Sequence, residues 1–142
     1  MTDTDTHDTH TGMILLVDDD SFIADMFSAQ LSARGFVVHE ALSADAALSL
    51  LRGGLIPDII IFDITMPQLN GLQFLDALRA GNLAPKAIRI ALTNDGKEGE
   101  EEEVYKRGAH AFLIKAATQT PELAATIDRL RTAGASAHAP VL

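Results

Sequence analysis

Short, mostly apolar runs alternate along the chain with longer segments in which apolar residues recur every three or four positions. Short apolar runs predict buried strands, and the wider spacing predicts amphipathic helices. The expected strands are 13–17, 36–40, 59–62, 87–92 and 111–114. The helices that follow them are expected to begin near Ser21, Ser43, Leu72, Glu100 and Thr120. The chain therefore repeats a strand followed by a helix five times.

The expected helix ends carry suitable capping residues. Serine and threonine are favoured before the first helical turn, and proline is favoured at its first position. We therefore expect Ser21, Ser43 and Thr120 to cap the first, second and fifth helices. Glycine often follows a helix, and Gly35 and Gly108 are expected to end the first and fourth.

Strands that are apolar throughout are buried on both faces, as in parallel sheets covered by helices on both sides. The pattern thus predicts an α/β fold, a doubly wound (βα)5 parallel five-stranded sheet. In such sheets ligands bind at the carboxyl ends of the strands, near the point where the strand order reverses. The residues at those ends are therefore the first candidates for function.

Polar residues that suit phosphoryl chemistry follow four of the five strands. They are Asp18, Asp19 and Asp20, then Asp63, Thr93 and Lys115. Clustered carboxylates favour a hard cation such as Mg²⁺, and a lysine and a hydroxyl can bind phosphoryl oxygens. One carboxylate could act as a nucleophile and form an aspartyl phosphate. Each residue alone also has a simpler interpretation, as a helix cap or a solvated strand end, so the inference depends on the joint arrangement.

Composition and charge narrow the classes of function. The chain has 142 residues, enough for one domain, and no cysteine, which excludes disulfides and thiolate sites. The net charge of −9, with no basic patch, argues against direct nucleic-acid binding. The sequence has no apolar run long enough for a membrane span and no secretory signal pattern. We therefore expect a cytoplasmic protein that does not contact the membrane.

Four segments together resemble the receiver domain of two-component response regulators. The segments are MILLVDDDS (13–21), IIIFDITMPQLNG (59–71), IALTND (90–95) and GAHAFLIKA (108–116). Their order and spacing match the family over about residues 13–132. The resemblance implies a flavodoxin-like receiver fold of the kind found in chemotaxis regulators.

The resemblance also implies a metal site and an acceptor. Asp63 corresponds to the phosphoacceptor, which takes a phosphoryl group from a histidine of a sensor histidine kinase or a histidine phosphotransfer protein. Asp18 and Asp19 correspond to the acidic pair that, with Asp63, holds Mg²⁺ or Mn²⁺. Thr65 corresponds to the position whose backbone carbonyl is a further metal ligand. Asp20 is expected to be a helix cap or a nearby charge instead of a main ligand.

Further residues match the family's switch and loop positions. Thr93 corresponds to the hydroxyl that moves toward the phosphoryl group, and Lys115 to the lysine that pairs with that group or with the acceptor. Phe112 corresponds to the switch aromatic, although a plain buried strand residue is an equal alternative. Pro67 and Gly71 correspond to the residues that shape the loop beside the acceptor.

The resemblance also implies how the signal is passed on. Phosphorylation would change the conformation of the face formed by the fourth helix, the fifth strand and the fifth helix, and this face would bind a downstream protein. A homodimer is a further alternative. The acidic stretch 97–107 lies on that face and either recognises a basic partner or is a solvated helix surface. We expect a stand-alone signalling protein with self-catalysed phosphotransfer and slow autodephosphorylation, and not a turnover enzyme.

Two departures from the family keep an alternative open. Ala116 stands where most receivers have a proline after a cis bond, and a non-proline cis bond is costly, so we expect a trans Lys115–Ala116 bond. Asn94 stands where a smaller residue is common. The alternative is a receiver fold that acts as an interaction module without phosphorylation. A haloacid dehalogenase-type phosphatase is disfavoured, because that class needs an aspartate at the position of Thr65.

The two ends of the chain differ in composition from the part between them. Residues 1–12 contain His7 and His10 among threonines and aspartates and are expected to form a disordered tail. Residues 13–132 are expected to form the receiver domain, and 133–142 a flexible tail.

Overall fold

The computed structural model describes residues 12–115, 118 and 120–133 of the chain. Its five strands form one parallel sheet with the order β2-β1-β3-β4-β5. The strands are β1 (Met13–Val17), β2 (Val37–Ala41), β3 (Ile59–Asp63), β4 (Ile88–Thr93) and β5 (Ala111–Ile114). The helices are α2 (Ser21–Ala33), α3 (Ala44–Arg52), α4 (Gly71–Ala80), α5 (Glu100–Lys106) and α6 (Thr120–Ala133). This is the predicted doubly wound α/β fold, with a flavodoxin-like strand order.

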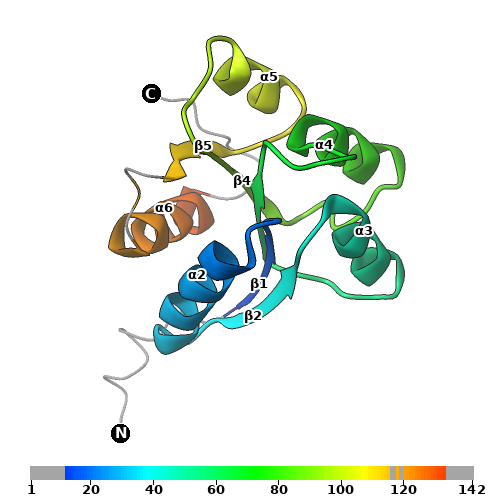
Figure 1. Ribbon diagram of the computed structural model, residues 1–142. Helices are drawn as coiled ribbons and strands as arrows, with labels where there is room; N and C mark the ends of the chain where they lie inside the picture. The colour runs from blue at the N-terminus through cyan, green and yellow to red at the C-terminus, as the bar shows by residue number, and fades with distance from the viewer. Residues whose placement is uncertain (1–11, 116–117, 119, 134–142) are drawn as a thin grey trace, which may run out of the picture.

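Helices cover both faces of the sheet, with α2 and α6 on one side and α3, α4 and α5 on the other (Figure 1). Successive residues of a strand point to opposite faces. In β1, Leu15 and Val17 pack with α3 and α4, whereas Ile14 and Leu16 pack with α2 and α6. Burial on both faces explains why β1 and β3 read as continuous apolar runs. The expectation of burial on both faces is wrong for the edge strands β2 and β5, most of whose residues are only partly buried or exposed.

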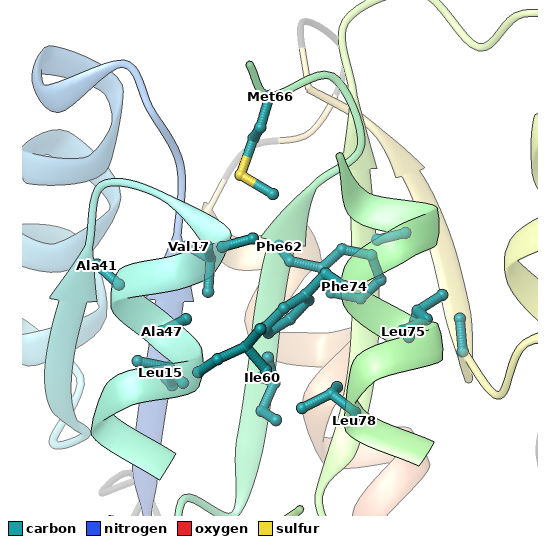
Figure 2. Packing of buried hydrophobic residues seen from close by; sticks show 14 of the residues in the cluster. Leu15, Val17, Ala41, Ala47, Ile60, Phe62, Met66, Phe74, Leu75 and Leu78 are labelled. Atoms are coloured by element: carbon teal, nitrogen blue, oxygen red, sulfur yellow. The ribbon is translucent and has the colours of Figure 1, made fainter. Parts of the chain in front are cut away.

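The α3–α4 side of the core is built around aromatic packing. The rings of Phe62 in β3 and Phe74 in α4 lie with centroids 5.6 Å apart (Figure 2). Both side chains are fully buried. This packing fixes β3 against α4, and so it fixes both ends of the loop that follows Asp63.

The helix caps agree only in part with the expectation. The N-cap of α2 is Asp20, whose carboxylate accepts from the backbone N–H groups of Phe22 and Ile23 at 3.1 and 3.2 Å. The predicted Ser21 cap is therefore wrong, because the stronger acceptor one residue earlier takes the position. Ser43 caps α3 as predicted.

Three expectations concern the last helix, the Lys115–Ala116 bond and the two ends of the chain. Thr120 is the first residue of α6. The Lys115–Ala116 bond, and the expected tails except Gly12 and Ala133, lie outside the described residues. Among the helices of the described part, none is both long and apolar enough to cross a membrane.

Candidate functional site

Three carboxylates meet at the carboxyl edge of the sheet, where the strand order reverses between β1 and β3. One oxygen each of Asp18, Asp19 and Asp63 lies within 4.8 Å of the others. Asp18 and Asp63 are buried and Asp19 is exposed. Such close negative charges repel one another unless a cation joins them, and oxygen-only donors suit Mg²⁺ or Mn²⁺. The donor set therefore fits the cation expected from the sequence.

Backbone groups hold the two buried carboxylates in place. Asp18 continues from β1, and its Oδ1 accepts from the backbone N–H of Asp20 at 2.9 Å. Asp63 is the last residue of β3, and its Oδ1 accepts from the backbone N–H of Thr65 at 3.2 Å. Each carboxylate thus keeps a second oxygen for other partners.

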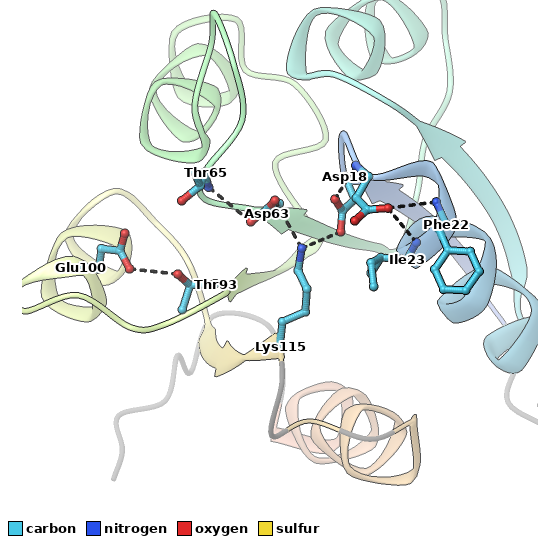
Figure 3. A network of polar contacts seen from close by, with 9 residues as sticks. Asp18, Phe22, Ile23, Asp63, Thr65, Thr93, Glu100 and Lys115 are labelled. Carbon is cyan, nitrogen blue, oxygen red and sulfur yellow. Dashed lines mark hydrogen bonds and ion pairs between the residues drawn. The ribbon is translucent and has the colours of Figure 1, made fainter.

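Lys115, which follows the last strand of the sheet, pairs with the second oxygen of both aspartates. Its Nζ lies 2.9 Å from Asp18 Oδ2 and 3.3 Å from Asp63 Oδ2 (Figure 3). The lysine side chain is only 10% exposed and each aspartate side chain only 3%. An ion pair so shielded from water is stronger than one on the surface. Lys115 therefore bridges the two buried acids.

Burial and charge perturb the ionisation of these groups. Burial raises the pKa of Asp63 from its usual 3.8 to about 6, with Asp18 adding to the rise and Lys115 opposing it. Burial alone would lower the pKa of Lys115, but its bonds to Asp18 and Asp63 outweigh that effect and raise the pKa. The ammonium is therefore a fixed charge, whereas the Asp63 carboxyl group can still take up a proton in mildly acidic solution.

A pH dependence of stability follows from the raised pKa of Asp63. The folded state holds this proton more tightly than the unfolded state, so the contribution of Asp63 to the free energy of unfolding is full below about pH 4. It is lost as the pH rises through about 6. We expect wild type to lose stability relative to Asp63→Asn over this window in metal-free buffer, as measured by urea unfolding. A constant difference between the two proteins from pH 4 to pH 7 would contradict the raised pKa.

The loop after Asp63 returns closely over the end of β3. The Gly71 N–H donates to the carbonyl of Ile64 at 2.8 Å. A Cβ at Gly71 would lie 2.7 Å from Ile64 Cα and 2.8 Å from the Asp63 carbonyl oxygen. Pro67 is exposed and its carbonyl accepts from the N–H of Leu69 at 2.8 Å, which closes a tight turn. Only glycine permits the approach at position 71.

Thr93 and Phe112 lie on the next two strands of the sheet, β4 and β5. Thr93 is the last residue of β4 and is fully buried, but its hydroxyl donates to Glu100 Oε1 at 3.1 Å and points away from Asp63 (Figure 3). Phe112 is half-buried in β5 and packs against the α3–α4 side of the core. Thr65 is exposed.

The structure thus brings Asp18, Asp19, Asp63 and Lys115 together, as the strand-end argument expected. The Thr93 hydroxyl is not part of this group, because it donates to Glu100. The sequence analysis does not single out Glu100, which it includes in the acidic stretch 97–107 as part of either a partner-binding or a solvated helix surface. The only signal was a glutamate three residues after Lys97, a spacing that allows a carboxylate to accept from the backbone N–H at the start of a helix.

Comparisons with known proteins agree with this geometry. A family model described as the response regulator receiver domain matches residues 14–128. Response regulator Rre1 of Synechocystis is 37% identical over 103 residues, which are 72% of this chain and 44% of that protein. The nitrate/nitrite response regulator protein NarL of Escherichia coli is 34% identical over 107 residues, 72% of this chain and 47% of that protein. The chain therefore spans less than half the length of these two relatives.

Solved structures give the same result. The chemotaxis protein CheY4 of Vibrio cholerae superposes with a TM-score of 0.77 and 28% identity. The superposition covers 84% of this chain and 98% of that one.

Proposed function

The chain belongs to the family of response regulator receiver domains, and on that premise we propose that Asp63 accepts a phosphoryl group from a histidine of a sensor kinase or of a histidine phosphotransfer protein. The observation that carries the proposal is the bridge from Lys115 Nζ to both Asp18 and Asp63. It gives the acceptor carboxylate a buried cation, next to the carboxylates that could hold a metal ion. The alternative is a receiver fold that binds partners without phosphorylation.

In the proposed transfer, an Asp63 oxygen forms a bond to phosphorus while the bond from phosphorus to the donor's imidazole nitrogen breaks. The imidazole leaves with the bonding electron pair and takes up a proton. Such transfers depend mainly on positioning and on stabilisation of charge. Lys115 would then pair with a phosphoryl oxygen.

Receiver domains bind Mg²⁺ in an acidic pocket, and here Asp18, Asp19, Asp63 and the backbone carbonyl of Thr65 would hold it. When bound, the cation neutralises charge on the phosphoryl oxygens. Pro67 and Gly71 would keep the loop that carries Thr65 close to Asp63. The chain's own contribution is thus a preorganised set of carboxylates with one lysine.

We propose that the output lies on the face formed by α5, β5 and α6, and that Thr93 in β4 and Phe112 in β5 would respond to the new charge. A phosphoryl group adds roughly 1.5 to 2 negative charges and three acceptor oxygens. A downstream protein, or a second copy of the chain, would read the resulting change. A cytoplasmic location, beside the kinase that donates the phosphoryl group, is part of the proposal.

The test is the intact mass of the full chain after incubation with acetyl phosphate, with and without Mg²⁺. We expect the mass of one phosphoryl group to be added only with Mg²⁺, and peptide mapping to place it on Asp63. A chain that gains no phosphoryl group from acetyl phosphate, and none from a panel of histidine kinases, would favour the interaction module.

A further inference from the structure

Glu100, the first residue of α5, turns its side chain back toward the sheet. A single oxygen, Oε1, accepts from the Thr93 hydroxyl at 3.1 Å and from the Lys97 backbone N–H at 3.2 Å. The next two residues, Glu101 and Glu102, are exposed, whereas Glu100 is half-buried. The acidic start of α5 is therefore not uniform, because the Glu100 carboxylate contacts the buried Thr93 hydroxyl.

The turn before α5 explains this orientation. Gly99 is the N-cap in a left-handed conformation with φ 87°, and it has no side chain to cap the helix. Glu100 instead closes the turn before the helix, since its own N–H donates to the Lys97 carbonyl at 3.0 Å while its carboxylate accepts from the Lys97 N–H. These reciprocal bonds close the 97–100 turn and aim Oε1 at Thr93.

Thr93 has one hydroxyl proton to donate. In the resting structure that proton goes to Glu100, and Thr93 is completely buried, so water does not replace the bond. A phosphoryl group on Asp63 would offer a second acceptor to the same proton. The two acceptors exclude each other, because the hydroxyl cannot face both.

We propose that Glu100 is a positioning residue that holds Thr93 in its resting orientation and competes with the phosphoryl group for the threonine hydroxyl. This inference rests on the proposed function of Asp63. When Thr93 turns, Glu100 loses one of its two donors and keeps only the Lys97 N–H. The first turn of α5 is then less firmly held, so the Glu100 contact links the site to that helix.

The test is a titration of the full chain with beryllium fluoride, a phosphoryl mimic, in the presence of Mg²⁺. Backbone amide signals of Lys97 and α5 report the change by NMR. Removing the competing acceptor in Glu100→Ala should lower the half-saturating concentration about fivefold or more, given the strength of hydrogen bonds to charged groups. Glu100→Gln retains a weaker acceptor and should show a smaller decrease.

Two controls separate competition from a general effect on α5. Glu101→Ala removes the same charge from the same turn and should leave the titration unchanged. In a Thr93→Val background, which has no hydroxyl, Glu100→Ala should lose its effect. An equal effect in that background, or none beside wild-type Thr93, would overturn the inference.

The outcomes also distinguish a failure of the role of Glu100 from a failure of the proposed function of Asp63. If wild type responds to beryllium fluoride and Glu100→Ala responds identically, only the role of Glu100 is wrong. If neither protein responds, the acceptor role of Asp63 fails and the role of Glu100 fails with it.

Discussion

Replacing Asp63 with asparagine is expected to abolish Mg²⁺-dependent phosphorylation of the chain by acetyl phosphate. The amide lacks the nucleophilic carboxylate oxygen and is a poorer metal ligand. The fold should persist, because the amide oxygen can still accept from the Thr65 N–H and because a desolvated negative charge has been removed. The effect is therefore a complete loss of labelling in a protein that remains folded.

The measurement is intact mass after incubation with acetyl phosphate and Mg²⁺, paired with a circular dichroism spectrum. Asp20→Asn is the matched control, because it makes the same change on a nearby aspartate that caps α2. Asparagine is as good a cap as aspartate, so this variant should be labelled like wild type. Persistent labelling of Asp63→Asn would refute the acceptor assignment.

Replacing Gly71 with alanine is expected to lower the free energy of unfolding by about 2–3 kcal/mol, as overpacking of a tight site does. The new Cβ would lie 2.7 Å from Ile64 Cα and 2.8 Å from the Asp63 carbonyl oxygen, and both atoms belong to the backbone. Relief of these contacts must displace either α4 or the chain around the acceptor. We therefore also expect slower phosphorylation by acetyl phosphate. Urea unfolding and the rate of mass gain measure the two effects.

Gly53→Ala is the matched control for this change. Gly53 follows α3 with φ −80°, which alanine adopts freely, and it is exposed. Its new Cβ would meet the Ser49 carbonyl oxygen at 3.2 Å, a much milder contact. The stability of this variant should stay within about 0.5–1 kcal/mol of wild type. Equal losses in both variants would show that the close approach at Gly71 is not special.

The central strands β1 and β3 were predictable because burial on both faces requires apolar residues at almost every position. Each of the five strands was placed within one residue of its observed ends, and parallel pairing brought Asp18, Asp63 and Lys115 together. The N-cap residue of α2 could not be predicted in the same way, since Asp20 and Ser21 are both good N-cap residues and only the backbone conformation decides between them.

The partner of Thr93 could not be predicted for a different reason. Glu100 reaches it through a loop with two glycines at positive φ, Gly96 at 55° and Gly99 at 87°. Glycine adopts such angles freely, so the sequence leaves the path of this loop open. A contact seven residues along the chain depends on that path, and no periodicity encodes it.

The bridge from Lys115 to Asp63 spans 52 residues, and the bridge to Asp18 spans 97. During synthesis on the ribosome, Asp63 therefore emerges well before the lysine that completes its surroundings. At usual rates of translation the delay is roughly 3–10 s. Throughout that interval the nascent chain carries Asp63 without the lysine that pairs with it. On the proposed function, an unfinished chain would therefore be a poor substrate for a kinase, and phosphorylation would have to wait until the last strand is in place.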